Sequence, residues 1–458
     1  MQTFMRHLLL LVAVFVVYTA PLHAASLRQA VSLALENNPE LQVAKEYLDS
    51  VKYDVDISRA AYLPSLEVSG STRWNEFNTD NSEDENYNAH GYSADFKQKI
   101  VDVASYRRYQ TSKKQLKQEY KKYHQIYNNT IRKTVEVYFQ YLKKMTQIKT
   151  TRLELASTEQ RIQHVKISAQ HGNMAKSAIY EAQAKRDRVR SRLIFLKRDL
   201  GVSRERLFNL TQHNIEPTFN IESNFDIKPI DRDEEKQWSM AVIENNDAVQ
   251  IAKDAIDISK KELQQRNADF APVVDFSVSY NYENSQDQDS NADLRNGRSN
   301  DTIYSLNLTV PILSGGERYY SRKKSSQLLG HAYSQYDATV SSALLKLREL
   351  ILNINYNAES VDAYKSAIQS NYSSYEVIQK GNEIGVRTLS DVLAAERLLY
   401  DSIREYHDVH YDYVLNRVQF LEVVGDLDED KVITLSNTMK PFIATDPLVL
   451  PHFVKTKY

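Results

Sequence analysis

The chain contains four short stretches in which apolar and polar residues alternate. In one of them Leu66, Val68 and Trp74 are separated by polar neighbours, and in another Leu306 and Leu308 flank a polar residue. A period of two, with one apolar and one polar face, predicts β-strands of about ten residues, the length and pattern of strands in a membrane barrel. The predicted strands lie at about 63–75, 90–101, 272–284 and 302–313.

Each pair of predicted strands is followed by a long segment with helical character, 104–171 in the first half and 317–384 in the second. Apolar residues recur every seven positions in the first segment, at Ile148, Leu155 and Ile162, and the second segment keeps the same phase. As helices these segments would each be about 100 Å long. The heptad spacing predicts elongated helices packed as a left-handed coiled coil.

The two halves of the sequence repeat each other. Leu35-Glu36-Asn37-Asn38 returns 208 positions later as Ile243-Glu244-Asn245-Asn246, and the offset near the end of each long segment is 213. A duplication of this length predicts that both halves fold as the same unit. We expect a signal peptide at 1–24, a first repeat at 25–212, a linker or equatorial segment at 213–235, a second repeat at 236–425 and a C-terminal equatorial or tail segment at 426–458. Shorter helices are expected at about 26–60, 176–210, 236–268 and 389–424.

The composition narrows the class of protein. The absence of cysteine excludes disulfides and thiolate metal sites. The apolar run from Leu8 to Val17, which follows Arg6-His7, predicts a secretory signal peptide cleaved near Ala24. The net charge is −2 and the lysines and arginines are dispersed, so nothing favours binding of nucleic acid. These features indicate an exported protein of the Gram-negative envelope, either soluble or inserted as a β-barrel.

The predicted number of strands, four per chain, restricts the environment in which the sheet can lie. An open sheet cannot lie in lipid, because its edge strands leave backbone groups unpaired. Either the sheet is soluble, or two or three chains pool their strands into one closed barrel. A soluble periplasmic coiled-coil adaptor or scaffold is the alternative function, although an adaptor's strands should form a small barrel with a packed core. An enzyme is not predicted, because no Ser-His-Asp or Cys-His set is recognisable.

Two motifs, Pro311-Ile312-Leu313-Ser314-Gly315-Gly316 and Gly385-Val386-Arg387-Thr388-Leu389-Ser390-Asp391-Val392-Leu393, together with the repeat, resemble the TolC family of outer-membrane efflux and type I secretion channel proteins. The resemblance implies a mainly α fold with a small β part, assembled as a homotrimer. The four strands of each of the three chains would together form a 12-stranded barrel in outer-membrane lipid. A periplasmic α-helical tunnel would continue this barrel. It implies an exit duct served by a periplasmic adaptor (membrane fusion) protein and an inner-membrane transporter, with no cofactor.

The same resemblance gives the turns at Gly172 and Gly385 the role of a periplasmic tip that is closed at rest. Arg387 resembles the family's latch arginine, which would bond across to the neighbouring helix turn near Ser177 and hold the tip shut. Ser390 is the remaining residue assigned to this gate. Asp391 would repeat around the threefold axis as an acidic ring that attracts cations. The alternative is that Thr388 to Asp391 form a capping box that starts the returning helix. Ala178 and Ala394 stand where the family has acidic residues, which predicts a looser latch.

Three further groups of residues complete the predicted features. The glycines after Pro311, Gly315 and Gly316, would let a strand bend into a helix. Aromatic residues on the strands would suit the two membrane interfaces, with plain strand propensity as the alternative. These aromatics are Trp74, Tyr92, Tyr280, Tyr282 and Tyr304. His407 and His410 have the spacing of metal ligands on a helix, but without converging ligands a solvated helix face is favoured and no metal site is predicted.

Overall fold

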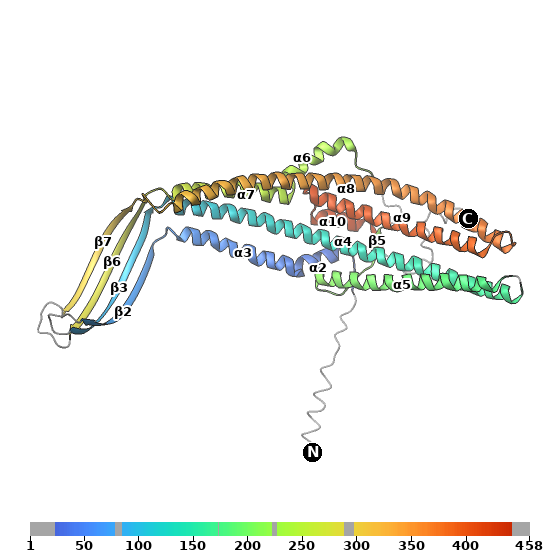
Figure 1. Cartoon of the computed structure of the whole chain (residues 1–458), viewed down its shortest axis with the longest axis horizontal. Helices are drawn as coiled ribbons and strands as arrows, with labels where there is room; N and C mark the ends of the chain where they lie inside the picture. Colours follow the sequence, from blue (N-terminus) through green and yellow to red (C-terminus); the bar gives the residue numbers. More distant parts are fainter. Residues whose placement is uncertain (1–22, 78–84, 173, 222–226, 288–296, 442–458) are drawn as a thin grey trace, which may run out of the picture. The chain divides into compact units, whose positions relative to one another are not determined.

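The computed structural model describes residues 23–77, 85–172, 174–221, 227–287 and 297–441 (Figure 1). The predicted signal peptide lies outside this range except for its last two residues, as does most of the predicted tail. The chain divides into two compact units. The first comprises residues up to Val43, His124–Asn246 and Ser342 onward, and the second comprises Ala44–Tyr123 and Asp247–Ser341.

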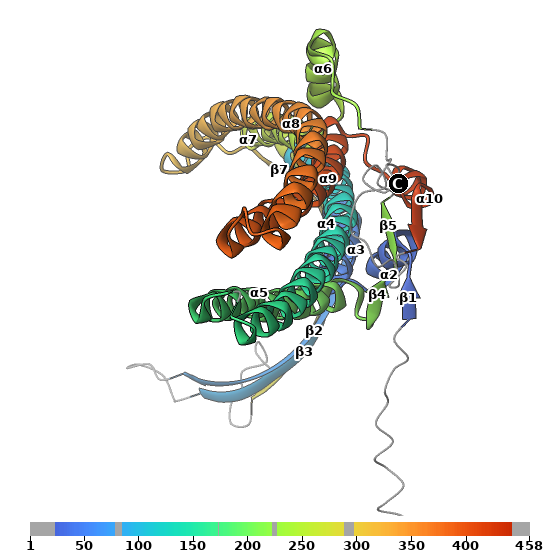
Figure 2. The ribbon, with the colours of Figure 1, turned by 90° about the vertical axis from the view of Figure 1, so that its right-hand side faces the viewer.

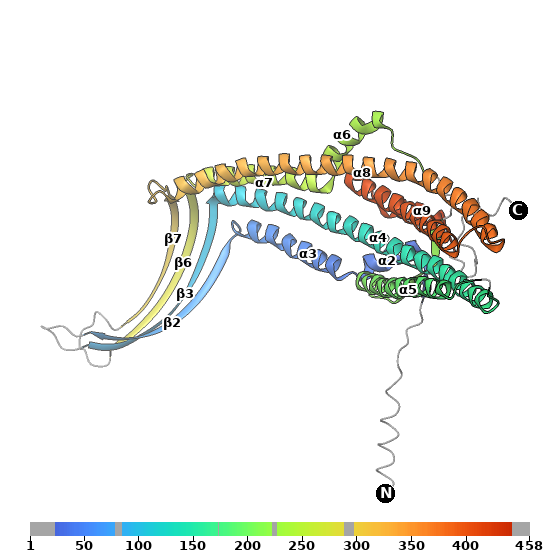
Figure 3. The ribbon, with the colours of Figure 1, turned by 45° about the vertical axis from the view of Figure 1, so that its right-hand side comes forward.

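The second unit contains one antiparallel sheet. Its strands are β2 (Ser65–Phe77), β3 (Glu85–Val101), β6 (Val273–Asp287) and β7 (Gly297–Thr309), in the order β2-β3-β6-β7. They lie side by side in Figure 3. The four predicted strands therefore exist, and β3 and β7 begin about five residues earlier than expected. Strands β2 and β7 form the two edges of the sheet.

The register of the sheet places the alternating residues on common faces. Tyr92 is paired with Tyr282, and their rings stack at 4.9 Å between centroids. Leu306 is paired with Phe276 and Leu308 with Val274 on the same face. This face is open to solvent within one chain, with Leu306 72% exposed. The opposite face is polar and includes Asp275 and Asn307, whose side chains are hydrogen-bonded at 3.0 Å.

Helices α3 (Pro39–Ala60) and α7 (Asp247–Ala268) accompany the first turns of the long helices α4 (Val103–Gln170) and α8 (Glu317–Glu383) in the second unit. Polar contacts join α4 to α7: Lys121 pairs with Asp254 at 2.6 Å, and the Gln118 side chain donates to the carbonyl of Ile251 at 2.9 Å.

The first unit contains the rest of α4 and α8, each paired with a returning helix. Helix α5 (Lys176–Thr211) returns beside α4, and α9 (Leu389–Val424) returns beside α8, as the end-on view in Figure 2 shows. The predicted heptad positions are packed between these helices. Thr151, Thr158 and Ile368 are fully buried, and Ile148 and Ile162 are 4% exposed. The predicted coiled-coil seam is therefore present.

Smaller elements surround the main core of the first unit. Helices α2 (Leu27–Asn37), α6 (Glu235–Asn245) and α10 (Glu429–Asn437) and the short 3₁₀ turn η1 (Arg232–Glu234) pack around the long helices. Strand β1 (His23–Ala25) pairs in parallel with β4 (Ile215–Pro217), and β5 (Phe219–Ile221) pairs antiparallel with β8 (Met439–Pro441). The largest fully buried side chains include Tyr138, Phe139, Leu142, Leu350 and Ile354.

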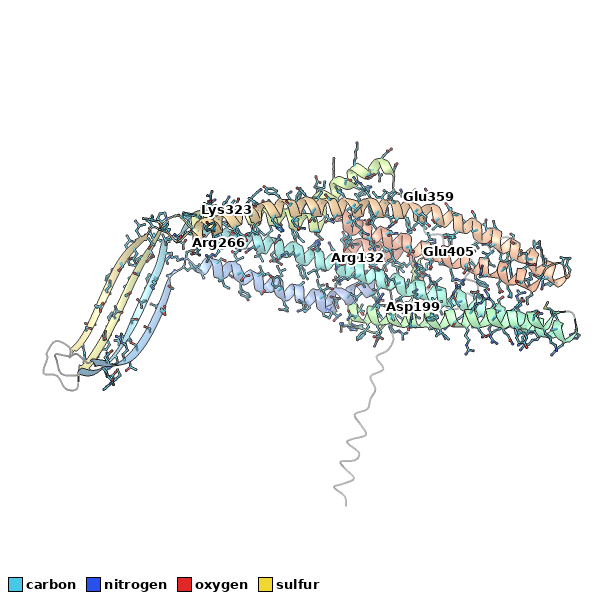
Figure 4. All side chains as sticks on the ribbon, viewed as in Figure 1. Arg132, Asp199, Arg266, Lys323, Glu359 and Glu405 are labelled. Carbon is cyan, nitrogen blue, oxygen red and sulfur yellow. The ribbon has the colours of Figure 1, made fainter. Side chains whose placement is uncertain are left out.

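Ion pairs supplement this apolar core. Arg132 of α4, labelled in Figure 4, pairs with Glu136 on its own helix at 2.8 Å and with Glu422 of α9 at 2.9 Å. Asp199 of α5, also labelled there, lies 3.5 Å from Lys144 of α4. Helix α4 is therefore joined to both returning helices by charge as well as by apolar packing.

The predicted helices at 26–60 and 236–268 are each interrupted by an asparagine. Helix α2 ends and α3 begins around Asn38, whose side-chain oxygen accepts a hydrogen bond from the backbone N–H of Leu41 at 3.0 Å. Asn246 likewise stands between helices α6 and α7. Asparagine can satisfy the free N–H groups at a helix start, which explains why two helices replace one. Among the described residues, no helix is long and apolar enough to cross a membrane.

Candidate functional site

The first unit contains both turns that the sequence analysis singled out, one between α4 and α5 and one between α8 and α9. Gly172 and Gly385 have φ angles of 74° and 79°, a left-handed conformation that glycine adopts without strain. The second turn is fixed by hydrogen bonds: the N–H of Val386 donates to the carbonyl of Gly381 at 2.8 Å, and the Asn382 side chain donates to the carbonyl of Arg387 at 2.8 Å. The α8–α9 turn is therefore a defined structure.

Asp391 takes part in the start of α9. The backbone N–H of Thr388 donates to the Asp391 carboxylate at 3.0 Å, and the N–H of Asp391 donates to the Thr388 hydroxyl at 3.2 Å. The bond from the Thr388 backbone, aided by its hydroxyl and by the nearby charge of Arg387, holds the pKa of Asp391 below its ordinary value. The predicted capping box is present, and the acidic ring stays a prediction.

The structure does not join Arg387 to Ser177. Both side chains, and that of Ser390, are exposed, and within the described residues no hydrogen bond connects Arg387 with Ser177. The aliphatic part of Arg387 lies over Gly381, where an added Cβ would come within 2.8 Å of the arginine Cγ. Ala178 is buried in an apolar cluster with Ala182, Ile162, Val165 and Leu389. The latch of Arg387 therefore stays a prediction.

A cluster of charged side chains that the sequence analysis missed is buried between α4, α5 and α9. Glu154 of α4 accepts hydrogen bonds from Lys185 of α5 at 2.6 Å and from Arg404 of α9 at 2.9 Å. Glu154 is only 1% exposed, and the two cations are buried with it. We call these three residues the Glu154 cluster. Because the cations belong to two different helices, Glu154 joins α5 and α9 through α4.

A second polar set follows along α4. Ser157 donates to one carboxylate oxygen of Glu396 on α9 at 2.6 Å, and Arg161 donates to the hydroxyl of Tyr375 on α8 at 2.9 Å. Arg161 Nε and the other oxygen of Glu396 lie 3.9 Å apart, too far for a hydrogen bond. Burial raises the pKa of Glu396 above its ordinary value. Both polar sets connect the α4–α5 hairpin with the α8–α9 hairpin.

A groove of about 540 Å³ runs between α5 and α9 next to the Glu154 cluster. Glu154 and Lys185 lie at its floor, and three exposed arginines lie along it, Arg188, Arg192 and Arg397. The predicted site residue Ser390 lies at the same groove. A comparison of the two repeats could have found this cluster. A shift of 213 positions aligns Glu154 with Ala367 and Lys185 with Leu398, so both charged residues have apolar counterparts in the second repeat.

The interpretation of His407 and His410 as part of a solvated helix face was wrong for His410. Its side chain is buried, 6% exposed, and packs edge-to-face against Tyr406. Burial lowers the pKa of His410 to about 4, so the imidazole is neutral at pH 7. Asp408, two residues away and so on a different face of α9, accepts a hydrogen bond from Gln147 of α4 at 2.8 Å. In the described part of the chain, no group of His, Asp and Glu side chains is placed to hold a metal ion.

The structure also places the predicted strand residues. Pro311 is the second residue after the end of β7 at Thr309, and Gly315 and Gly316 have φ angles of 60° and 86° just before α8 begins. They therefore form the strand-to-helix turn that the sequence indicates. Trp74 and Tyr304 are exposed on the apolar face of the sheet, 57% and 72% respectively, and Tyr92 stacks on Tyr282 there. The membrane-interface role of these aromatics stays a prediction.

Comparison with known proteins agrees with this architecture. The family model described as outer membrane efflux protein matches residues 30–212 and 238–426. The outer membrane protein TolC of Vibrio cholerae is 25% identical to this chain, and the match covers 91% of this chain and 94% of TolC. The alkaline protease secretion protein AprF of Pseudomonas aeruginosa is 22% identical, and the match covers 89% of this chain and 85% of AprF. The CmeC outer membrane channel of Campylobacter jejuni superposes with a TM-score of 0.75 at 18% identity, covering 90% of this chain and 89% of CmeC. The chain therefore belongs to the outer membrane efflux protein family and is a channel protein of the outer membrane, neither an enzyme nor a periplasmic adaptor.

Proposed function

We propose that this protein is the trimeric exit duct of a tripartite efflux pump or type I secretion system, through which substrates pass without energy input from the duct itself. Three copies of the four-stranded sheet would close a 12-stranded barrel in the outer membrane. The helices of both repeats would line a tunnel through the periplasm. The partners would be a periplasmic adaptor protein and an inner-membrane transporter.

The observation that carries this proposal is the sheet. Its apolar face is exposed along β2 and β7, where Leu66 and Val68 are both 70% exposed and Leu306 is 72% exposed. Within the four-stranded sheet, β2 and β7 each have one unpaired edge. An apolar face and two open edges are unstable in water, and pairing β7 of one copy with β2 of the next removes the edges. Lipid contact accounts for the apolar face.

The turns at the ends of α4–α5 and α8–α9 would form the periplasmic entrance. In this proposal Asp391 supplies a ring of carboxylates, and Arg387 helps to keep the entrance closed. The aromatics Trp74, Tyr92, Tyr280, Tyr282 and Tyr304 would lie at the membrane interfaces. The secretion relatives include AprF of Pseudomonas aeruginosa and the proteases secretion protein PrtF of Dickeya chrysanthemi, which favour a protein as cargo. The similarity to TolC proteins keeps small molecules as the second class of cargo.

The direct test is reconstitution. The mature protein, purified in detergent, is expected to have the mass of three chains and to form ion-conducting channels in planar lipid bilayers. A protein that stays monomeric and gives no conductance would contradict the proposal. Deleting the gene should also abolish either secretion of a specific protein or resistance to toxic small molecules, and the phenotype would identify the cargo.

A further inference from the structure

The apolar face of the sheet ends in a row of polar side chains. Thr72 of β2 pairs with His90 of β3, which pairs with Asn284 of β6. Asn284 pairs in turn with Arg298 of β7, so the row crosses all four strands. Because side chains alternate between the two faces of a sheet, this row lies on the same face as Leu306. We call these four polar residues the Arg298 row.

A cation is exceptional on this face. The ion pairs and acidic residues of the sheet lie on the opposite face, as Arg73 and Glu283 do, which are 3.2 Å apart. The carboxylate nearest to the row along the apolar face of the described strands is Glu76. It lies four residues beyond Thr72, roughly 13 Å along β2, and accepts a hydrogen bond from the Trp74 indole at 3.3 Å. The exposed Arg298 therefore gives the end of an apolar face a positive charge.

The height of the row in the proposed barrel follows from the length of the strands. Asn284 lies ten residues from Val274 along β6, about 34 Å along the strand and about 26 Å in height at a strand tilt of about 40°. The apolar band of a membrane barrel is about 25 Å tall. The row therefore lies where the hydrocarbon ends. Strands β3 and β7 lead into α4 and α8 at their other ends, so the row faces the outer leaflet, away from the periplasm.

We propose that the Arg298 row binds a phosphate group of lipid A, the phosphorylated glycolipid of the outer leaflet. The inference rests on the proposed function, in which this face of the sheet lies in the outer membrane. The Arg298 guanidinium can donate two parallel hydrogen bonds to one phosphate. An arginine on the lipid face costs much less free energy at the membrane interface than in the hydrocarbon, and a lipid phosphate supplies the opposite charge at that height.

The other members of the row add neutral hydrogen-bonding groups. The side-chain nitrogen of Asn284 lies 3.2 Å from Nε2 of His90. Because an amide nitrogen only donates, Nε2 accepts this bond, and the Nδ1–H of the neutral ring is left as a donor.

The row has too little charge to hold free phosphate. Arg298 supplies its one permanent positive charge, and a single exposed ion pair in water is weak. Acyl chains attached to the phosphate would add binding energy by packing on the apolar face beside the row, where Tyr92 and Tyr304 are exposed. This combination favours a phosphorylated lipid over inorganic phosphate.

The test measures binding of lipid A to the purified trimer in detergent by native mass spectrometry. We expect lipid A with two phosphates to bind about tenfold more tightly than the same lipid without phosphates. Arg298→Gln should weaken binding of the phosphorylated lipid about tenfold, and Arg298→Lys, which keeps the charge but not the paired hydrogen bonds, about threefold. The matched control is Arg73→Gln, which removes an exposed arginine from the opposite face of the sheet and should change the affinity less than about twofold.

Several results would overturn the lipid A site. Equal weakening by Arg298→Gln and Arg73→Gln, no weakening by either, or equal binding of the lipid without phosphates would each do so. Phosphatidylglycerol that binds as tightly as lipid A, with the same loss in Arg298→Gln, would assign the row to phospholipids. Displacement of lipid A by millimolar inorganic phosphate would assign it to free phosphate.

The proposed function is tested separately. Phosphatidylcholine bilayers contain no lipid A, so the trimer mass and the conductance of the wild type in them do not depend on the site. Arg298→Gln should conduct like the wild type there. A wild-type trimer that conducts but binds no lipid A would overturn the site and leave the duct intact.

Discussion

Asn38 and Asn246, which lie 208 positions apart, make the same kind of contact in the two repeats. The side-chain amide of Asn38 donates to the carbonyl of Leu210 at the end of α5, at 3.4 Å, and that of Asn246 donates to the carbonyl of Val423 at the end of α9, at 2.9 Å. Each asparagine thus separates two helices and fixes the end of the returning helix of its own repeat. The free carbonyl groups at a helix C-terminus are satisfied in this way.

The first prediction follows from this contact. Asn38→Ala removes the bond to Leu210 and the cap on Leu41 from a buried position, so the free energy of unfolding should fall by about 1–3 kcal/mol. Asn246→Ala should have a similar effect. Thermal unfolding of the purified variants measures the change. Asn37→Ala serves as the control because the Asn37 side chain donates to the carbonyl of Leu33 within its own helix. Equal effects of Asn37→Ala and Asn38→Ala would show that the contact between helices is unimportant.

The second prediction concerns the lipid face of the sheet. Arginine at Leu306 or Leu308 should destabilise the barrel by about 2–4 kcal/mol near the middle of the bilayer and reduce trimer assembly. Arginine at Asn307, on the polar face, should be tolerated. Yield of heat-resistant trimer in outer-membrane fractions gives the readout. If all three variants assembled equally well, the apolar face would not be in lipid.

The third prediction separates the two roles of Asp391. Asp391→Asn removes the charge, so we expect lower cation selectivity and weaker block by multivalent cations added from the periplasmic side of a bilayer. Thr388→Ala removes the capping hydroxyl and keeps the charge, so it should lower stability by about 1 kcal/mol with selectivity unchanged. Arg387→Ala should raise conductance with selectivity nearly kept. If the Asp391→Asn channel had the selectivity of the wild type, Asp391 would act only at the start of helix α9 and not in an acidic ring.

The fourth prediction is a pH dependence of stability. Burial gives His410 a pKa of about 4 in the folded protein, whereas the ordinary pKa of histidine is 6.5. Between these values the unfolded chain binds a proton that the folded chain does not, so stability is complete above pH 6.5 and falls as the pH drops toward 4, by at most about 1.4 kcal/mol per pH unit. His410→Leu should flatten this part of the curve, as measured by thermal unfolding at several pH values. His164→Leu, at an exposed position of α4, should leave the curve unchanged.

The strands and long helices could be predicted because their periods are visible in the sequence. The alternation around Asn307 marks the two faces of a single strand. The heptad spacing of Thr151 and Thr158 marks the buried face of a single helix. The breaks at Asn38 and Asn246 could not be predicted, because asparagine is compatible with a turn, a cap or a polar helix position. The capping box at Asp391 involves residues three positions apart and was visible for that reason.

The Glu154 cluster could not be predicted because its members are far apart in the sequence. Lys185 is 31 positions from Glu154, and Arg404 is 250 positions away. Only the packing of α4 against both returning helices brings them together. His410 was misjudged for the same reason, since its neighbour Tyr406 packs with Val361 and Ile368 of α8, and the burial of this face of α9 depends on where α8 lies.

The even number of strands in the sheet has a consequence for symmetry. Neighbouring strands are antiparallel throughout, so β2 and β7 run in opposite directions. In the proposed assembly, β7 of one copy therefore meets β2 of the next as an ordinary antiparallel pair, with every copy oriented alike in the membrane. Pairing β2 with β2 would also be antiparallel, but it would turn one copy upside down and place its helices outside the cell. The strand order thus selects a head-to-tail ring over a twofold dimer, and the curvature of the sheet then sets how many copies close the ring.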